Sequence, residues 1–491
     1  MGTRTSDLRL APASLALAQR YRDAARTAIS PTSGWPVVAL LALSDLASIS
    51  MAVAFSGTVW SDARLPFYLS LWPLLPLFLT AYAVAGLYPG IAIHPVEELR
   101  RASISTTLVY LLLLAITFLL KRDVAAYSRA VFLLAWAQSL VLFPLARGTA
   151  RKLFAKKVWW GFPAVVLGAG TMGKHVVRAL KRRPELGLNP VAVLDDQPDL
   201  PETIDGVPAM GAIALGPVLA REFRIRYAIV AMPEISHDEL LDVLSRCGEA
   251  FPHLLLIPNL FDYSSLWVEP TDLGGVLGLE IRQQLLQPGA RLLKFLLDFV
   301  LAAVGGLLAL PLVGVAGILI KCTSKGPVCY GHTRVGLGGR QFKAWKFRTM
   351  VQDADKALQR HLDKNPQLRL EWEQNQKLRH DPRVTCIGKL LRKTSLDELP
   401  QLWNVLRGEM SLVGPRPIVE NEIPRYGGKF ALYHKVKPGI TGLWQVSGRS
   451  DTGYEERVRL DAYYVRNWSV WLDIYVLART FEAVFLRSGA Y

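Results

Sequence analysis

The sequence predicts a membrane protein in three parts: an N-terminal four-helix transmembrane bundle, a Rossmann-like α/β domain, and a C-terminal mixed α/β domain with a re-entrant membrane helix. Three observations predict this class. Long apolar runs bring the hydrophobic residues to 51% and the mean hydropathy to +0.23. Short β-rich runs alternate with helical patterns between residues 162 and 260. A further apolar stretch, 292–320, has basic residues on both sides.

The charge and the cysteines narrow the classes of partner. The formal net charge is +16. Together with the apolar runs, this excess of Lys and Arg indicates that the partners are anionic lipid head groups and phosphorylated substrates. We expect no nucleic-acid partner. The four cysteines show neither metal-type spacing nor a disulfide framework, which is typical of a reducing compartment. The Arg-rich segment 1–33 has no prompt small-residue cleavage site, so we expect a cytoplasmic tail.

The transmembrane domain is expected over residues 34–147, because this region contains four apolar runs near the ~20 residues that cross a bilayer. The four predicted spans are 35–57, 66–88, 102–120 and 128–146. Arg100 and Arg101, in the loop expected between the second and third spans, and the basic run from Arg147 to Lys157 belong on the cytoplasmic side. The loop with Lys121 and Arg122 fits this orientation less well.

The α/β domain is expected over residues 158–285. Its β-rich runs are AVVLGAG (164–170), VAVLDD (191–196) and YAIVAMP (227–233). In the first run, Gly168, Gly170 and Gly173 of GAGTMG fit a dinucleotide-binding fingerprint, and Asp195 follows at the distance of a ribose-binding acid. The same glycines also serve close packing of a helix on a sheet, and that alternative stays open.

The stretch 292–320 is longer than the ~30 Å hydrocarbon core if it forms one straight helix. Gly305, Gly306 and Pro311 interrupt it, and basic residues on both flanks indicate that both ends stay in the cytoplasm. We therefore expect a re-entrant helical hairpin that enters one leaflet and returns. The alternative is a fifth full span, which would place residues 321–491 outside.

The clearest chemical feature is the adjacent pair Asp397 and Glu398 at the expected start of an amphipathic helix. Ser395 and Glu398 also have capping-box spacing, so a purely structural interpretation competes. Cationic residues favour the chemical one, because phosphoryl transfer needs a nucleophile, cations for the phosphate oxygens and usually a metal. These cations are Lys346, Arg348, Arg392 and Arg416.

The C-terminal domain, expected over residues 286–491, contains the stretches KGPVCYGHTRVG (325–336), KFRTM (346–350), DPRVT (381–385), RKTSLDELPQLWNVLRGEMSLVGPRP (392–417), KPGITGLWQVSGR (437–449) and SGAY (488–491). In these stretches, residues 289–491 resemble the catalytic domain of the bacterial polyprenyl phosphohexose-1-phosphate transferases, the monotopic phosphoglycosyl transferases. The four spans and the Rossmann-like domain resemble the large members of this family. One departure is Leu310 before Pro311, where small members often have Ser-Pro, which affects the geometry expected for the hairpin.

The resemblance implies roles for individual residues. Asp397 would be the nucleophile, and Glu398 would position Mg²⁺ or support proton transfer, so both carboxylates are candidate metal ligands. Asp473 would be a further polar residue that the family requires. The alternative is a structural role for Asp473 in a salt bridge with Arg479. The phosphate-binding residues would be Lys346, Arg348, Arg392 and Arg416, each with contact to lipid head groups as its alternative.

The resemblance also implies an activity: transfer of a hexose 1-phosphate, with galactose expected, from a UDP-hexose to undecaprenyl phosphate. UMP would leave, a phospho-aspartyl sugar would form on Asp397, and the product would initiate O-antigen, capsule or exopolysaccharide synthesis. The expected location is the bacterial inner membrane with the catalytic domain on the cytoplasmic face, and a homodimer is compatible with the chain. Two rivals are a membrane-tethered NAD-dependent sugar-nucleotide oxidoreductase that uses GAGTMG, and a noncatalytic scaffold of polysaccharide export.

Overall fold

The computed structural model divides into two compact units, Met1–Asp262 and Tyr263–Tyr491. It describes residues 35–60, 74–119, 129–157, 159–197, 199–258, 268–272, 277–281, 285, 288–351, 358–359, 363, 383–447 and 453–485. The predicted tail 1–33, the loop with Lys121 and Arg122, and the terminal SGAY lie outside the described residues. Each unit is considered by itself.

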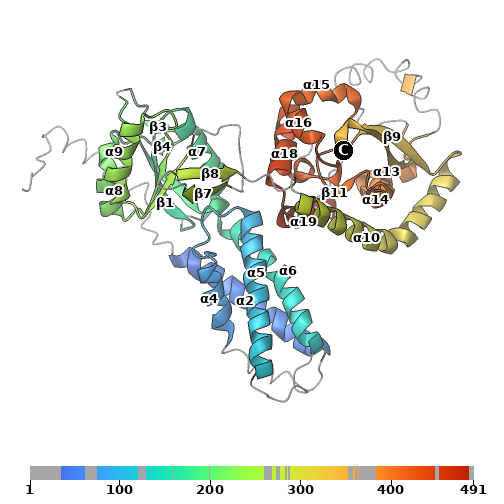
Figure 1. Cartoon of the computed structure of the whole chain (residues 1–491), viewed down its shortest axis with the longest axis horizontal. Coiled ribbons are helices and arrows are strands. Elements are labelled where there is room, and N and C mark those ends of the chain that lie inside the picture. The colour runs from blue at the N-terminus through green and yellow to red at the C-terminus, as the bar shows by residue number, and fades with distance from the viewer. Residues whose placement is uncertain are drawn as a thin grey trace, which may run out of the picture. The chain divides into compact units, whose positions relative to one another are not determined.

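Each of the four apolar segments predicted near the N-terminus contains a helix (Figure 1). These are α2 (Trp35–Trp60), α4 (Leu75–Val84), α5 (Pro95–Leu119) and α6 (Arg129–Phe154). Among the described residues, α2, α5 and α6 are long and apolar enough to cross a membrane, whereas α4 is a shorter apolar helix. The first part of the second predicted span, 66–73, lies outside the described residues.

Three arginines differ from their predicted positions. Arg100 and Arg101 lie inside α5 and not in a loop, and Glu97 in its first turn pairs with both guanidiniums at 2.7 Å. Arg147 lies inside α6 and is buried, not placed at the end of a span. Its guanidinium lies 2.7 Å from Asp45 of α2 and 2.7 Å from Glu98 of α5. These buried carboxylates make a charge inside the bundle tolerable.

The α/β domain has a parallel four-stranded sheet in the order β2-β1-β5-β6. Its strands are β1 (Phe162–Leu167), β2 (Leu188–Leu194), β5 (Tyr227–Val230) and β6 (His253–Leu256). Helix α7 (Thr171–Arg182) packs on one face, and α8 (Gly216–Phe223) and α9 (His237–Gly248) pack on the other. A short hairpin, β3 (Thr203–Ile204) and β4 (Val207–Pro208), lies beside β2. The parallel order confirms the predicted α/β winding.

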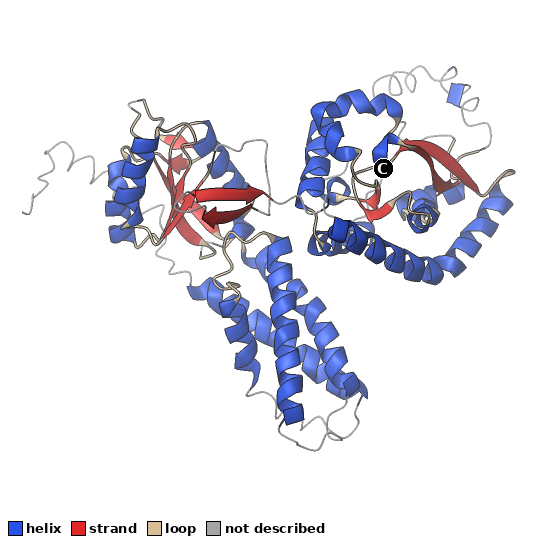
Figure 2. Ribbon diagram, viewed as in Figure 1, coloured by secondary structure: helices blue, strands red, loops and turns tan. Residues whose placement is uncertain are grey.

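The second unit combines short sheets with many helices (Figure 2). Its pairs of strands are antiparallel β7 (Val268–Asp272) and β8 (Leu277–Ile281), antiparallel β9 (Cys329–Val335) and β10 (Gln341–Phe347), and parallel β11 (Ser411–Val413) and β12 (Gly439–Thr441). Its helices are α10 (Pro288–Thr323), α13 (Cys386–Lys393), α14 (Gln401–Leu406), α15 (Ile423–Tyr426), α16 (Phe430–Tyr433), α17 (Leu443–Ser447), α18 (Tyr454–Asn467) and α19 (Val470–Phe485). The β7–β8 hairpin, which the sequence places in the α/β domain, falls in this unit.

Helix α10 contains the stretch expected to form a re-entrant hairpin, and it is one continuous helix of 36 residues. Figure 1 shows this helix bent and not divided into the two separate helices of the expected hairpin, and its re-entrant course stays a prediction. Pro311 removes one backbone donor and crowds the preceding turn, which bends a helix without ending it. Ala302 in the first arm and Ile320 in the second both pack into the cores of this unit. The opposite face exposes a row of Leu, Val and Phe side chains.

Candidate active site

Lys346 on β10 brings the predicted carboxylate pair into one site. Its Nζ lies 2.6 Å from Oε1 of Glu398 and 4.0 Å from Oδ2 of Asp397. The two carboxylates belong to a single 3₁₀ turn, Leu396–Glu398, that precedes α14 and packs against β10. The fold therefore places a cation and two carboxylates together although 51 positions of sequence separate Lys346 from Asp397.

The structure contradicts the capping-box interpretation of this pair. Ser395 has φ 56°, in the left-handed region, and its side chain caps no backbone amide. Glu398 is bonded to Lys346 and not to the backbone of Ser395. Because a non-glycine residue in this region is strained, such conformations persist where the surrounding structure enforces them, often beside functional groups.

The environment of Asp397 leaves its carboxylate available. Burial raises the pKa of Asp397 above its ordinary value, and the charge of Lys346 opposes this shift most strongly. Glu398 raises the pKa further, whereas Arg392 lowers it. Among the described residues, no side chain donates a hydrogen bond to Asp397, and its ion-pair partner Lys346 lies 4.0 Å away.

Two of the predicted phosphate-binding arginines, Arg392 and Arg348, have different surroundings. Arg392 of α13 acts electrostatically on Asp397, and its Nε donates to Thr349 Oγ1 at 2.9 Å. Arg348 follows β10, and its Nη2 donates to the carbonyl oxygen and the hydroxyl of Ser324, each at 2.8 Å. Its Nε and Nη1 are buried without a hydrogen-bond partner in the described part of the chain. The structure brings Arg392 to the carboxylates but shows no contact between them and Arg348.

Arg416 leads to two residues that the sequence analysis missed. Its guanidinium lies 5.2 Å from the centre of the Trp444 ring, and that of Arg457 lies 5.4 Å from the same ring. Burial and the neighbouring Arg457 lower the pKa of Arg416, and Glu398 opposes that shift. Nε and Nη2 of Arg457 are buried without a partner among the described residues. The sequence feature that could have pointed to Arg457 is its i, i+4 spacing from Asp461, because residues at this spacing lie on the same face of a helix.

Close backbone packing explains two glycine-containing motifs near Arg416. In VGPRP and KPGITG, β11 and β12 run parallel, and Gly414 N donates to Thr441 O at 2.9 Å. A Cβ on Gly439 would lie 2.1 Å from Gly414 N, and one on Gly442 would lie 2.2 Å from Gly414 O. These positions therefore exclude side chains, and the pairing fixes the loop that carries Arg416.

Asp473 is not among the groups brought together here. Its carboxylate lies 2.7 Å from Nζ of Lys294 in α10 and accepts hydrogen bonds from Tyr464 Oη and Trp468 Nε1. Its expected alternative partner, Arg479, pairs with Glu482 instead. The structure gives Asp473 a packing role, which is to join α19 to α10.

The glycine motif of the first unit has a structural explanation. A Cβ on Gly173 would lie 1.9 Å from Gly168 O, and Gly168 has φ 108° against the backbone of Ala231. Gly170 caps α7 and faces open space. Asp195 accepts the backbone N–H groups of Ala169 and Gln197 at 2.6 and 3.0 Å. Helix–sheet packing and loop bonding therefore account for Gly168, Gly173 and Asp195 without a ligand.

The carboxylate pair fits a magnesium ion of the kind that a diphosphate substrate brings. No group of three or more His, Cys, Asp and Glu that could hold a metal occurs among the described residues. Mg²⁺ at phosphoryl-transfer sites is commonly held by one or two carboxylates plus substrate phosphates and water. Asp397 and Glu398 match that donor set.

Comparison with known proteins matches two families along the chain. The family described as bacterial sugar transferase matches residues 289–487, and the family described as CoA-binding domain matches residues 84–258. A UDP-galactose-lipid carrier transferase from Erwinia amylovora is 37% identical over 74% of this chain and 76% of its own length. An undecaprenyl-phosphate galactose phosphotransferase from Salmonella typhimurium is 36% identical over 74% and 77%.

A third relative has a different sugar in its name. The UDP-glucose:undecaprenyl-phosphate glucose-1-phosphate transferase of Escherichia coli is 34% identical over 66% of this chain and 68% of its own length. All three similarities extend well beyond the 199 residues of the sugar transferase match. The chain therefore belongs to the bacterial sugar transferase family and is a membrane-associated sugar phosphotransferase.

Proposed function

We propose that this chain transfers hexose 1-phosphate from a UDP-hexose to undecaprenyl phosphate and releases UMP. Galactose is the proposed sugar, since two of the similar proteins are named for galactose and show higher identity than the one named for glucose. The observation that supports this proposal most is the environment of Asp397. Among the described residues no side chain donates a hydrogen bond to it, and Lys346 lies 4.0 Å away. A nucleophilic carboxylate needs oxygens that are not already bonded and a nearby cation.

The proposed reaction has two displacements at one phosphorus atom. An oxygen of Asp397 attacks the β-phosphorus of UDP-hexose, the bond to the bridging oxygen breaks, and UMP leaves with that electron pair. A phosphate oxygen of undecaprenyl phosphate then attacks the same phosphorus and releases the Asp397 carboxylate. Mg²⁺, when bound, would neutralise charge on the diphosphate.

Other residues of the site would hold the donor and its charge. Lys346 lies within reach of both carboxylates and would offset the charge that develops on the transferred phosphoryl group. Glu398, which pairs with Lys346 in this structure, would hold the metal when it is bound. Arg416 and Arg457, which flank Trp444, would hold the nucleotide phosphate that becomes UMP.

Helix α10 supports a site at a membrane surface. A straight helix of this length would extend about 1.5 Å per residue and carry its ends to opposite sides of a bilayer. Both arms of α10 instead pack on the same unit and expose their apolar face, which supports a re-entrant helix in the inner membrane with the site on the cytoplasmic side. Lipid-linked and soluble substrates would then meet at the level of the head groups.

The test is the identity of the released nucleotide. The full-length protein in detergent is incubated with undecaprenyl phosphate, Mg²⁺ and either UDP-galactose or UDP-glucose, and the products are separated by chromatography. The proposal predicts UMP from the wild type, faster release with UDP-galactose, and no UMP from Asp397→Asn. Release of UDP would mean ordinary glycosyl transfer and would contradict the mechanism, and faster release with UDP-glucose would contradict the sugar assignment alone.

A further inference from the structure

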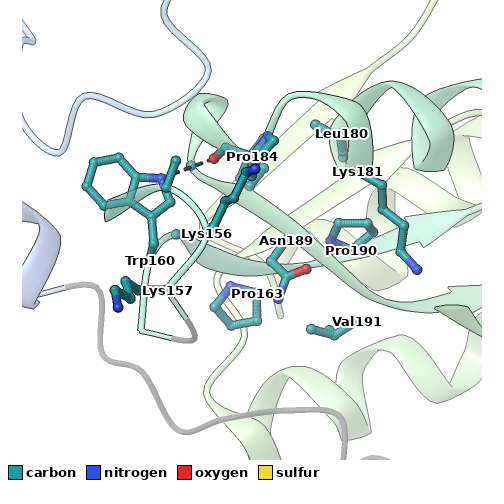
Figure 3. A pocket seen from close by; sticks show the side chains of 14 residues that line it. Lys156, Lys157, Trp160, Pro163, Leu180, Lys181, Pro184, Asn189, Pro190 and Val191 are labelled. Atoms are coloured by element: carbon teal, nitrogen blue, oxygen red, sulfur yellow. Dashed lines mark hydrogen bonds between the residues drawn. The ribbon is translucent and has the colours of Figure 1, made fainter. Parts of the chain in front are cut away.

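The α/β part of the first unit contains a cavity of about 470 Å³ that is separate from its glycine motif (Figure 3). The cavity lies at the amino-terminal ends of β1 and β2, whereas GAGTMG follows the carboxyl-terminal end of β1. Its volume is in the range of about 300–1,000 Å³ that is typical of small-ligand sites. Its walls come from the segment after α6, the end of α7 and the first half of β2.

The charge of this cavity indicates an anionic ligand. Its lining includes Lys156, Lys157 and Lys181 but no aspartate or glutamate. Lys181 donates to the backbone carbonyl of Asp205 at 2.7 Å, a contact that leaves its charge uncompensated. Neither Lys156 nor Lys157 is paired with a carboxylate among the described residues. Three cations without a counterion on one concave wall favour a ligand that carries phosphate.

The walls of the cavity are held in place by the fold. The indole Nε1 of Trp160, which is buried, donates to Pro184 O at 3.1 Å across the rim (Figure 3). β2 is an edge strand, and β4 covers only its second half, where Val193 bridges Ala209. The first half, which includes Pro190, lines the cavity.

The position of the cavity along the chain indicates where such a ligand comes from. Its first lining residue, Ala155, directly follows α6, a helix able to cross a membrane. A Cβ on its wall residue Gly187 would lie 3.6 Å from Ile91 Cγ1, and Ala92 N donates to Leu186 O at 2.9 Å. The cavity thus borders the loop between α4 and α5 as well as the end of α6. We propose that it binds a phosphate-bearing anion, either the head group of an anionic phospholipid or a free phosphate.

The test measures lipid and phosphate binding to the full-length protein in detergent by native mass spectrometry. The variant Lys156→Ala/Lys157→Ala/Lys181→Ala removes the three cations of the cavity. The matched control Lys174→Ala/Arg182→Ala/Arg221→Ala removes three exposed cations of the same domain that do not line it. We expect phosphatidylglycerol to bind the wild type and the control equally and the cavity variant about tenfold more weakly.

Measuring lipid binding with and without inorganic phosphate distinguishes the two sources of the anion. Phosphatidylglycerol binding that inorganic phosphate does not displace identifies a lipid head group, and displacement by phosphate identifies a free anion. A second variant, Asn189→Trp, fills the cavity without changing its charge and should abolish the same binding. Equal affinity for phosphatidylcholine and phosphatidylglycerol, or equal loss of binding in the cavity and control variants, would overturn the proposal.

Discussion

The second unit contains two clusters of the same composition, one lysine between two carboxylates, in different environments. In the first, Lys294 lies 3.2 Å from Asp298 and 2.7 Å from Asp473, and all three side chains are about 10% exposed or less. In the second, Lys346 lies 2.6 Å from Glu398 and 4.0 Å from Asp397, with exposures of 25%, 32% and 15%. We call them the packing triad and the reactive triad.

The difference between the triads is how completely their oxygens are bonded. In the packing triad, Asp298 also accepts from Ser411 Oγ and Leu412 N, and Asp473 accepts from Tyr464 and Trp468. In the reactive triad, Asp397 has only the more distant lysine among the described side chains. Full bonding is what a buried charge requires for stability. Incomplete bonding is what a nucleophile requires for reaction, so bonding separates the two roles where composition does not.

The largest expected effect comes from Asp397→Asn. The amide keeps the shape of the carboxylate but is a poor nucleophile, so UMP release should fall by more than about 10³-fold. The thermal unfolding midpoint should stay close to that of the wild type, since no described side-chain bond depends on this carboxylate. Activity assays and a thermal melt on the same preparation check both halves. A large fall in the midpoint with substantial remaining activity would assign Asp397 to packing.

The converse change, Asp473→Asn, should act on stability. It leaves Lys294 with only the longer contact to Asp298 in a buried place, which we expect to cost about 3 kcal/mol of the free energy of unfolding. The matched control on α19 is Glu482→Gln, which breaks a more exposed pair with Arg479 and should cost less than about 1 kcal/mol. Thermal or denaturant unfolding measures the difference. Similar stability losses in the two variants would contradict the assignment of the packing triad.

Lys346→Met tests the electrostatic part of the reactive triad. In the proposed reaction Asp397 attacks as the carboxylate, and the charge of Lys346 lowers the pKa of Asp397 more than any other group does. Removing this charge raises the pKa of Asp397, so the acid limb of the pH–rate profile should move to higher pH. We also expect a rate loss of about 10²-fold near neutral pH. Lys343→Met, an exposed lysine of the same strand, is the control, and an unmoved or lowered acid limb would contradict this role.

The smallest predicted effect concerns Arg457→Lys. The substitution keeps the charge but removes the planar donors that are unpartnered in the described structure. We expect the KM for the UDP-hexose to rise about tenfold with little change in kcat. Arg459→Lys on the exposed side of α18 is the matched control. An unchanged KM would remove Arg457 from the nucleotide site.

The sequence predicted the proximity of the residues in the reactive triad better than that of the residues around Arg416. Asp397 and Glu398 are adjacent in the chain, so their proximity needed no fold, and a matching motif included Lys346. Arg457 and Trp444 could not be assigned to the site because their approach to Arg416 depends on how α17 and α18 pack. In the sequence, Asp473 and Asp397 were both predicted to be site residues from the family resemblance. Only the hydrogen bonds of Asp473 in the structure distinguish the two.

The fold was predictable where periodicity dominates. The parallel sheet followed from β-rich runs, and the apolar helices followed from hydropathy. Arg147 was misplaced because hydropathy cannot show that Asp45 and Glu98 on other helices neutralise it. Gly305, Gly306 and Pro311 permit a bend or a break equally well, so the sequence could not show that α10 stays one continuous helix. Packing of Ala302 and Ile320 on the same unit accompanies the bend that the structure has.

The central claim, that Asp397 and not its counterpart Asp473 forms a covalent intermediate, is tested most directly by intact-protein mass spectrometry. The full-length protein is incubated with UDP-galactose and Mg²⁺ without undecaprenyl phosphate and is then quenched in acid. We predict that the wild type and Asp473→Asn each gain one hexosyl phosphate, that this adduct maps to Asp397, and that Asp397→Asn gains none. An adduct on Asp397→Asn, or a wild type that releases UMP only after acceptor is added and never carries the sugar phosphate, would contradict the account.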